Sequence, residues 1–303
     1  MERVAAPADG MRMSPMRNFN EDNITQAVLD RMIACTDPRT RKISEALVRH
    51  LHAFVKEIEP TEAEWSRAIA FLTDTGQMCS DTRQEFILLS DTLGVSMLVD
   101  AINHRFNGDA TQTTVLGPFY VEEAADLQSG ANISREPGGM PLIVEGTVED
   151  AHGNGIANAM IETWHADGSG MYDVQRATGK SALDMRARFR TDANGRFWYR
   201  SVVPAAYPIP DDGPVGKMLD AQGRHPFRPA HVHFKLSAPG YETIVTHVFI
   251  DDDPYLDSDV VFGVKDALIT KLLKIDGHVS PGGHEVAPNT MLLTYRFVLP
   301  SQS

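Results

Sequence analysis

Apolar side chains follow one spacing in the first third of this chain and another spacing afterwards, with the change near Gly108. In the first part they recur every three or four residues, as on one face of a helix. The clearest stripe consists of Ile43, Leu47, Leu51, Phe54, Val55 and Ile58. This spacing predicts helices over residues 20–105, with the stripe buried in a core.

Two more helices are expected before the change. Thr61 and Glu64 have the spacing of a capping box, so a helix should begin there and end near Gly76. A further segment, from about Asp81 to Asp100, is apolar on more than one side. A helix of that kind is typically wedged between other elements, so we expect it to be the most buried one.

The segments after Gly108 are short, rich in β-branched and aromatic residues, and separated by glycine-bearing turns. The expected strands are Leu142–Glu149, Ala157–His165, Arg196–Val203, His231–Leu236, Thr243–Ile250 and Met291–Leu299. Short strands joined by such turns predict a β-sandwich. The chain is therefore expected to be an α+β protein, with a helical domain over residues 1–115 and a sandwich domain over residues 116–303.

Composition narrows the class of protein. The chain has 303 residues, 42% of them apolar, and a formal net charge of -13. An acidic chain lacks the basic surface that nucleic acid or an anionic membrane requires. No stretch has the length of a signal-peptide core or of a membrane span. We therefore expect a cytoplasmic protein in which Cys35 and Cys79 are small buried residues rather than a disulfide framework.

The most informative segment runs from Arg228 to Phe234 and contains His231 and His233. Alternate residues of a strand face the same way, so both imidazoles lie on one face of the sheet. They are either metal ligands or a pair of hydrogen-bonded histidines. No cysteine follows residue 79, which argues against a Cys/His zinc site, and no glutamate follows His233 at the spacing of a cupin.

Two tyrosines are placed to complete a metal site. Tyr172 follows a glycine-bearing turn, and Tyr207 follows the expected strand that ends at Val203. A loop tyrosine can simply hold its hydroxyl in water. Two phenolates beside two imidazoles, however, would suit Fe(III), because a trivalent cation favours deprotonated phenol oxygens.

The chain resembles the intradiol ring-cleaving dioxygenases, of the catechol and hydroxyquinol 1,2-dioxygenase type, over nearly its whole length. Its motifs, read in order, are Leu116–Tyr120, Glu162–Tyr172, Arg190–Arg196, Arg200–Tyr207 and Arg228–Phe234. The resemblance implies one non-haem Fe(III) per subunit, with Tyr207 and His233 as axial ligands and Tyr172 and His231 as equatorial ligands. It also places Arg228 in the catalytic cleft, where its charge would stabilise negative charge on the substrate ring.

The resemblance is strongest to the hydroxyquinol branch, on the residues from Tyr207 to Gly216. It implies cleavage of benzene-1,2,4-triol by O2 to 3-hydroxy-cis,cis-muconate and maleylacetate. Asp91 would accept a hydrogen bond from the third hydroxyl, unless it is a mid-helix carboxylate in water. The substrate-binding residues implied are Leu88, Asp91, Val115, Leu116, Gly117, Pro118, Phe119, Ile209, Pro210 and Arg228.

His247 departs from the catechol-type pattern, which has Gln at this position. It is expected either to support the metal ligands from behind or to be a satisfied core residue. The resemblance further implies a homodimer formed through the helical domain, with a phospholipid in an apolar tunnel at the interface in some members.

Three alternatives stay open. The substrate could be catechol or a chlorocatechol, since pocket width depends on how the helices pack. The sandwich could be a transthyretin-like module that binds without catalysis. A two-histidine Fe(II) oxygenase would require a carboxylate ligand, and no well-spaced one is present in the sequence. A ferric tyrosinate absorbs visible light, so colour distinguishes the ferric site from both of the last two.

Overall fold

The computed structural model describes residues 17–80, 83–105, 108–122, 124–135, 139–176 and 183–302. Asp81, where a helix was expected to begin, lies outside these residues. The chain divides into two compact units, one up to Leu72 and one from Thr73 onwards, and each is described by itself. Among the helices of the described ranges, none combines the length and the apolar character that a membrane crossing requires.

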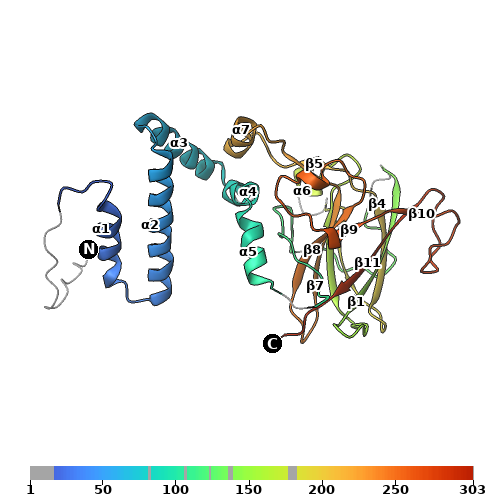
Figure 1. Ribbon diagram of the computed structural model, residues 1–303. Helices are drawn as coiled ribbons and strands as arrows, with labels where there is room; N and C mark the ends of the chain where they lie inside the picture. Colours follow the sequence, from blue (N-terminus) through green and yellow to red (C-terminus); the bar gives the residue numbers. More distant parts are fainter. Residues whose placement is uncertain are drawn as a thin grey trace. The chain divides into compact units, whose positions relative to one another are not determined.

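The first unit includes the helices labelled in Figure 1 as α1 (Ile24–Arg31) and α2 (Pro38–Ile58), with the short 3-10 turn η1 (Met32–Ala34) between them and the first part of α3 (Glu62–Met78) after them. The carboxylate of Asp37 caps α2 by accepting a hydrogen bond from the Thr40 amide at 2.7 Å. The prediction that the α2 stripe is core is wrong for this chain. The exposed side chains, between 44% and 63% accessible, are Ile43, Leu47, Leu51, Phe54, Val55 and Ile58. Periodicity identifies the apolar face of a helix, but it does not show what covers that face.

Helix α3 (Glu62–Met78) begins as predicted. The Glu64 amide donates to Thr61 Oγ1 at 3.2 Å, and the Thr61 amide donates to Glu64 Oε2 at 2.9 Å. The expectation of buried cysteines is wrong, because Cys35 and Cys79 are both free and partly exposed. Each follows the end of a helical element, where the chain is less covered.

The helix expected up to Asp100 is two helices in the structure, α4 (Glu85–Thr92) and α5 (Val95–Asn103). Between them Gly94 has a φ of 71°, a left-handed conformation that ends one helix before the next begins. Leu88 and Asp91 of α4 are buried, so this helix does pack against other elements of its unit.

The predicted β-sandwich is confirmed. In the described residues one sheet has the strand order β10-β11-β1-β4 and the other β3-β2-β7-β8-β9. The strands of the first sheet are β1 (Pro141–Glu149), β4 (Arg196–Val202), β10 (Leu273–Lys274) and β11 (Met291–Val298). Those of the second are β2 (Met160–His165), β3 (Arg186–Arg190), β7 (His231–Ser237), β8 (Ile244–Ile250) and β9 (Ile269–Thr270).

The main core lies between the two sheets. Phe234 of the second sheet meets Phe197 and Phe297 of the first, with ring centroids 6.3 Å and 4.8 Å away. Every second residue of β7, namely Val232, Phe234 and Leu236, points into this core. The intervening residues, among them His231 and His233, therefore face the other side of the second sheet.

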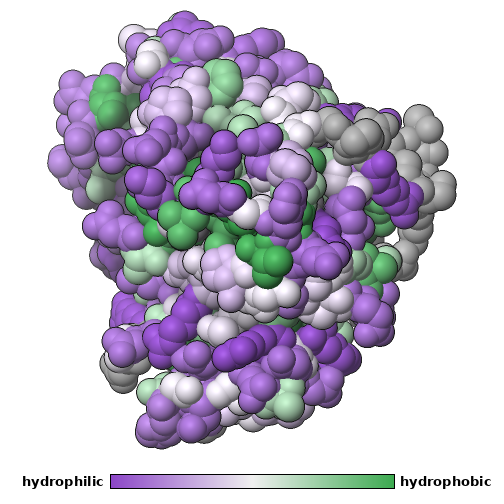
Figure 2. All heavy atoms as spheres, turned by 90° about the vertical axis from the view of Figure 1, so that its right-hand side faces the viewer, coloured by the Kyte–Doolittle hydropathy of each residue, from purple (hydrophilic) through white to green (hydrophobic). Residues whose placement is uncertain are grey.

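The loops between the longer strands carry several short elements. They are β5 (Tyr207–Pro208), α6 (Asp173–Arg176), α7 (Pro214–Ala221), β6 (Phe227–Arg228), η3 (Leu256–Ser258) and η4 (Asp266–Leu268). On the face of the β-rich unit shown in Figure 2, hydrophilic residues predominate, and hydrophobic residues show between them in a band across the middle.

Candidate metal centre

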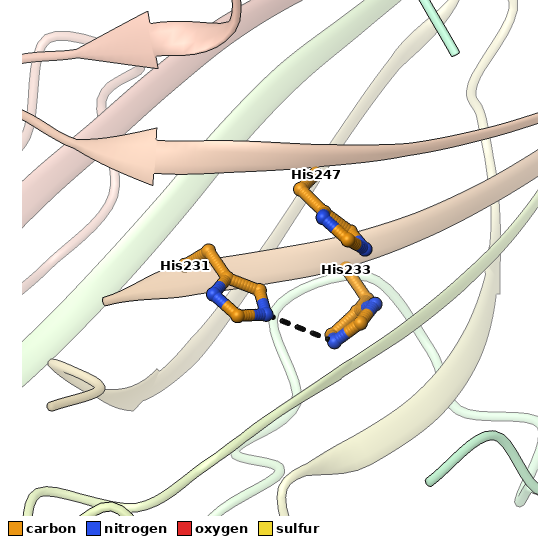
Figure 3. Close-up of side chains that lie close together, drawn as sticks. All are labelled: His231, His233 and His247. Atoms are coloured by element: carbon orange, nitrogen blue, oxygen red, sulfur yellow. Dashed lines mark hydrogen bonds between the residues drawn. The ribbon is translucent and has the colours of Figure 1, made fainter. Parts of the chain in front are cut away.

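Three imidazoles meet on the outer face of the second sheet. His231 and His233 come from β7, and His247 comes from β8, where it pairs in register with His233. Figure 3 shows the three rings, with Nε2 of His231 and Nε2 of His233 only 3.1 Å apart. All three side chains are buried, and one nitrogen from each lies within 4.8 Å of the others.

Two tyrosine hydroxyls complete this cluster. Tyr172 Oη lies 3.0 Å from His233 Nε2 and 3.5 Å from Tyr207 Oη. The exposed-hydroxyl alternative is therefore wrong for both, since Tyr172 is fully buried and Tyr207 is only 2% accessible. The structure thus brings the side chains of Tyr172, Tyr207, His231 and His233 together at one point.

Local structure explains how the tyrosines reach this point. The carboxylate of Asp167 accepts hydrogen bonds from the Ser169 and Met171 amides at 2.8 Å and 3.0 Å, which closes the turn that leads into Tyr172. Tyr207 lies on β5 and pairs with Arg228 of β6 in a two-residue ladder. Both backbones are therefore fixed close to the sheet face.

The protonation states favour a cation at the cluster. Burial and the adjacent positive charge of Arg228 together lower the pKa of His231 to about 3. Burial likewise holds the pKa of His233 and of His247 well below the usual range. Burial and the neighbouring Tyr207 raise the pKa of Tyr172. The imidazoles are therefore neutral, with lone pairs to donate, while phenolates would need a nearby positive charge.

The tautomer of His231 also fits a metal ligand. Its Nδ1 lies 2.7 Å from the carbonyl oxygen of Pro229, which can only accept a hydrogen bond. The proton is therefore on Nδ1, and Nε2 presents a lone pair toward His233 and the tyrosines. Two imidazoles and two phenol oxygens form a donor set suited to a hard trivalent ion.

Arg228 lies beside the cluster and is 2% accessible. Its Nε and Nη2 donate to the two oxygens of the Asp259 carboxylate at 3.0 Å and 3.1 Å. Burial opposes the charge of Arg228, but Asp259 and Tyr207 outweigh burial and raise its pKa above the ordinary value. The guanidinium is therefore a permanent buried cation.

Sequence reasoning did not find Asp259. It lies 31 residues after Arg228, and no motif connects the two residues. The available signal was a single acidic residue directly before the apolar run Val260–Phe262. A carboxylate in such a run is buried only when it is paired.

A cavity of about 870 Å³ opens beside the cluster. The expected substrate-binding residues that line it are Asp91, Val115, Leu116, Gly117, Pro118, Phe119 and Pro210. Its other lining residues, which are outside the expected set of substrate-binding residues, include Ile87, Ser90, Tyr120 and Val174. Phe119 connects the cavity to the cluster, because its ring stacks on Tyr172 with centroids 4.4 Å apart.

Two of the expected pocket residues lie in the adjoining apolar cluster. Leu88 and Ile209 pack there with Val260 and Val261. Asp91 is 4% accessible, so the alternative of a carboxylate in water is wrong. Burial raises the pKa of Asp91 above its ordinary value.

Gly117 allows the cavity wall to approach a histidine of the cluster. Its φ is 78°, and a Cβ at this position would lie 3.1 Å from Cε1 of His233. A larger residue would therefore be strained in its backbone and would press on the imidazole.

Two family models match the chain. The model described as "Catechol dioxygenase N terminus" matches residues 37–111, and the model described as "Dioxygenase" matches residues 115–301.

Curated proteins of high identity have concordant names. The hydroxyquinol 1,2-dioxygenase of Rhizobium sp. (strain MTP-10005) is 50% identical, over 85% of this chain and 88% of that protein. The 6-chlorohydroxyquinol 1,2-dioxygenase of Cupriavidus pinatubonensis is 51% identical, over 84% of this chain and 92% of that protein.

Solved structures agree with the fold. The hydroxyquinol 1,2-dioxygenase of Pseudomonas putida DLL-E4 has a TM-score of 0.89 and 47% identity, and the match covers 93% of this chain and 99% of that chain. The catechol 1,2-dioxygenase of Pseudomonas arvilla C-1 has a TM-score of 0.78 and 29% identity, over 93% and 92% of the two chains.

Proposed function

This chain belongs to the intradiol ring-cleavage dioxygenases, and we propose that it uses O2 to cleave hydroxyquinol between two adjacent hydroxylated carbons. The product would be 3-hydroxy-cis,cis-muconate, which tautomerises to maleylacetate. The observation that carries the proposal is the convergence of two buried tyrosine oxygens and two buried histidine nitrogens beside a cavity of about 870 Å³. Relatives named hydroxyquinol 1,2-dioxygenase, at 45–50% identity, support the choice of substrate, as does one named 6-chlorohydroxyquinol 1,2-dioxygenase at 51%.

We propose that Tyr172, Tyr207, His231 and His233 hold one Fe(III) per subunit. Bound there, the ion would chelate both adjacent substrate oxygens and favour their deprotonated form. The neutral histidines and the fixed Nε2 lone pair of His231 support this assignment. A donor set of two phenolates would also balance much of the charge of a trivalent ion in a buried place.

The protein groups around the ion have distinct tasks in this proposal. Tyr207 would help to hold the ion before the substrate binds, and its Oη would accept a proton from a substrate hydroxyl. Arg228 stabilises the negative charge that develops on the ring. His247 Nδ1 lies 3.4 Å from Arg228 Nη2, so His247 would act by orienting the guanidinium. Phe119 and Pro118 exclude water from the ring on the cavity side.

Oxygen uptake tests the reaction directly. The iron-loaded protein should consume O2 with hydroxyquinol and release the ring-opened acid, with slower uptake on catechol and chlorocatechols run in parallel. Cleavage next to the diol instead of within it would contradict the family chemistry. A colourless protein with no uptake would favour a binding module.

The visible spectrum tests the ligand set. Tyr207→Phe should shift or weaken the ferric tyrosinate band, while Tyr241→Phe, a change at a partly buried tyrosine paired in an isolated bridge with Ser301, should leave it unchanged. An unchanged band in Tyr207→Phe would remove this residue from the proposed ligands.

We propose that Asp91 selects the triol by accepting a hydrogen bond from its third hydroxyl. Asp91 is buried and lines the cavity. A buried polar group without its partner costs about 1–3 kcal/mol, so Asp91→Ala should reduce the preference for hydroxyquinol over catechol by about tenfold or more. Ser90→Ala, in the same cavity wall, is the matched control. An unchanged preference in Asp91→Ala would exclude this role.

We also propose a homodimer formed through the helical domain, residues 1–115, with residues 116–303 as the catalytic domain. The exposed apolar stripe of α2 supports this, because apolar surface in contact with water is unfavourable and a second subunit would cover it. A phospholipid could occupy part of the same apolar surface, and mass spectrometry of an organic extract would detect it. Light scattering should give twice the chain mass for the wild type and a smaller value for Leu47→Glu.

The compartment we propose is the cytoplasm. Cys35 and Cys79 are unpaired, as is usual for proteins of a reducing compartment. Fractionation of cells that produce the protein, followed by assay of hydroxyquinol-dependent O2 uptake in each fraction, would test this.

A further inference from the structure

We propose that Asp259 is a positioning residue of this enzyme, which holds the guanidinium of Arg228 in the one orientation that leaves Nη1 free for the substrate. This inference rests on the function proposed above. It concerns a residue on the loop after η3, outside the motifs on which the family resemblance rests.

Arg228 and Asp259 form a bidentate ion pair with two hydrogen bonds. Arg228 Nε meets Asp259 Oδ1 at 3.0 Å, and Nη2 meets Oδ2 at 3.1 Å, while both residues are at most 5% accessible. A bidentate geometry fixes the plane of the guanidinium as well as its distance. Rotation of the side chain would require both hydrogen bonds to break inside the protein.

The remaining donors of Arg228 point toward the metal cluster. Nη2 also lies 3.4 Å from His247 Nδ1, and Nη1 lies 3.4 Å from His231 Nε2. With Nε and Nη2 directed at Asp259 and His247, Nη1 is the nitrogen that faces the site. When the lone pair of His231 Nε2 is given to a metal, the Nη1 hydrogens are left for the oxygen or ring carbon of a bound diol.

Asp259 is itself held by its own loop. The Gly263 amide donates to Oδ2 at 2.9 Å, and the Phe262 amide donates to the Asp259 carbonyl at 3.0 Å. Val260 and Val261 are buried in the apolar cluster that also contains Leu88. The carboxylate therefore has a fixed position relative to α4, the helix that brings Asp91 to the cavity.

Gly263 permits this close packing. A Cβ at position 263 would lie 3.0 Å from Arg228 Nη2 and 3.2 Å from Asp259 Oδ2. These distances are too short for an ordinary contact, so an alanine would displace the fork by a few tenths of an ångström without removing any charge. Gly263→Ala is thus a graded perturbation of the same geometry.

The experiment compares Asp259→Asn, Asp259→Glu and Gly263→Ala with wild type. Asp257→Asn is the control, because it removes one carboxylate from an exposed position two residues away. For each protein we would measure iron content, the visible band, the change of that band on titration with hydroxyquinol under nitrogen, and kcat and KM in air. The band and the nitrogen titration report the site without turnover.

Asp259→Asn should retain iron and the visible band but lose about 10²-fold in kcat, since misplacement by about 1 Å can have an effect of this size. Gly263→Ala should lose less, and Asp257→Asn should stay within about twofold of wild type. Asp259→Glu, which restores the charge on a longer arm, should recover part of the loss. Full kcat in iron-loaded Asp259→Asn would overturn the proposal.

A double-mutant cycle separates positioning from general stability. If Asp259 acts through Arg228, Asp259→Asn should have almost no further effect on kcat/KM in an Arg228→Gln background. The same fold-loss in both backgrounds would overturn the proposal. If Asp259→Asn does not fold, the Gly263→Ala and Asp259→Glu proteins test the proposal instead. A wild-type kcat in both would overturn the positioning role of Asp259.

Failure of the proposed function gives a different pattern. A wild type that takes up no O2 with hydroxyquinol would reject that function. The titration under nitrogen, with hydroxyquinol and with catechol, would still show whether Asp259→Asn weakens diol binding at the coloured site. Unchanged binding there in all three variants would count against the positioning role.

Discussion

The two faces of the second sheet are both buried, but one packs in the core and the other carries the histidine cluster. On β7, Val232, Phe234 and Leu236 fill the space between the sheets, while His231 and His233 lie on the opposite face and form the histidine cluster with His247. The first face gains stability from apolar contact. The second buries groups that cost free energy unless they have partners. A strand can therefore be buried throughout and still divide stability and chemistry between alternate residues.

The largest effect is expected from a substitution on the face that carries His231 and His233, called the chemical face below. His233→Ala should abolish iron binding and the visible band, and activity should fall by more than about 100-fold, since even changes behind a ligand cost 10–100-fold. Metal analysis and O2 uptake would measure both effects. Alanine has no atom that can bind a metal, so we expect the variant to fold but to contain no iron.

The exposed His152 offers the matched control, and His152→Ala should behave as wild type. If His233→Ala kept its iron and its colour, the chemical face would have to be reassigned.

The next largest effect is expected on the opposite face, one residue further along. Phe234→Ala would leave a cavity between Phe197 and Phe297, and it should lower the free energy of unfolding by about 3–5 kcal/mol. Chemical denaturation would measure the loss. Val279→Ala, at a side chain that is 55% exposed, should change stability little. The folded Phe234→Ala protein should keep its visible band, and loss of colour without loss of stability would show that the faces are not separable.

A titratable group also lies on the core side. His165 Nε2 is 2.7 Å from Ser201 Oγ, and burial lowers the pKa of His165 to about 4. The unfolded chain binds this proton near pH 6.5, so stability should fall as the pH drops from about 6.5 to about 4, by about 3 kcal/mol. His165→Gln should lack this part of the loss when both proteins are compared in the same iron state. Parallel pH profiles of the two proteins would contradict the assignment.

The smallest effect concerns the wall that approaches the chemical face. Gly117→Ala should cost about 1–2 kcal/mol, because an alanine is strained at positive φ, and it should shift the visible band by pressing on His233. Gly153 has a φ of 81° and no atom within 4 Å of an added Cβ, so Gly153→Ala has the backbone cost alone. A band shift in both variants would show that the contact with His233 is not responsible.

The sequence predicted the sandwich and its longer strands because alternation is a local property. It also predicted, through motifs on three separated segments, that the side chains of Tyr172, Tyr207, His231 and His233 would lie together. It did not predict β3 (Arg186–Arg190), because an arginine at every second position hides the strand pattern, or the break at Gly94. Asp259 was missed because its partner is distant in the chain, and burial of the α2 stripe was wrongly expected because no local pattern describes a neighbour.

The two-residue ladder between Tyr207 and Arg228 has a consequence for redesign of substrate range. Substitutions after Tyr207, at Ile209 or Pro210, would alter the cavity and displace a proposed metal ligand together with the active-site cation. Ile87 and Ser90 of α4 line the cavity and lie outside the apolar cluster that contains Leu88 and Ile209. Libraries aimed at bulkier diols should therefore vary these two positions and leave Leu88 and the ladder untouched.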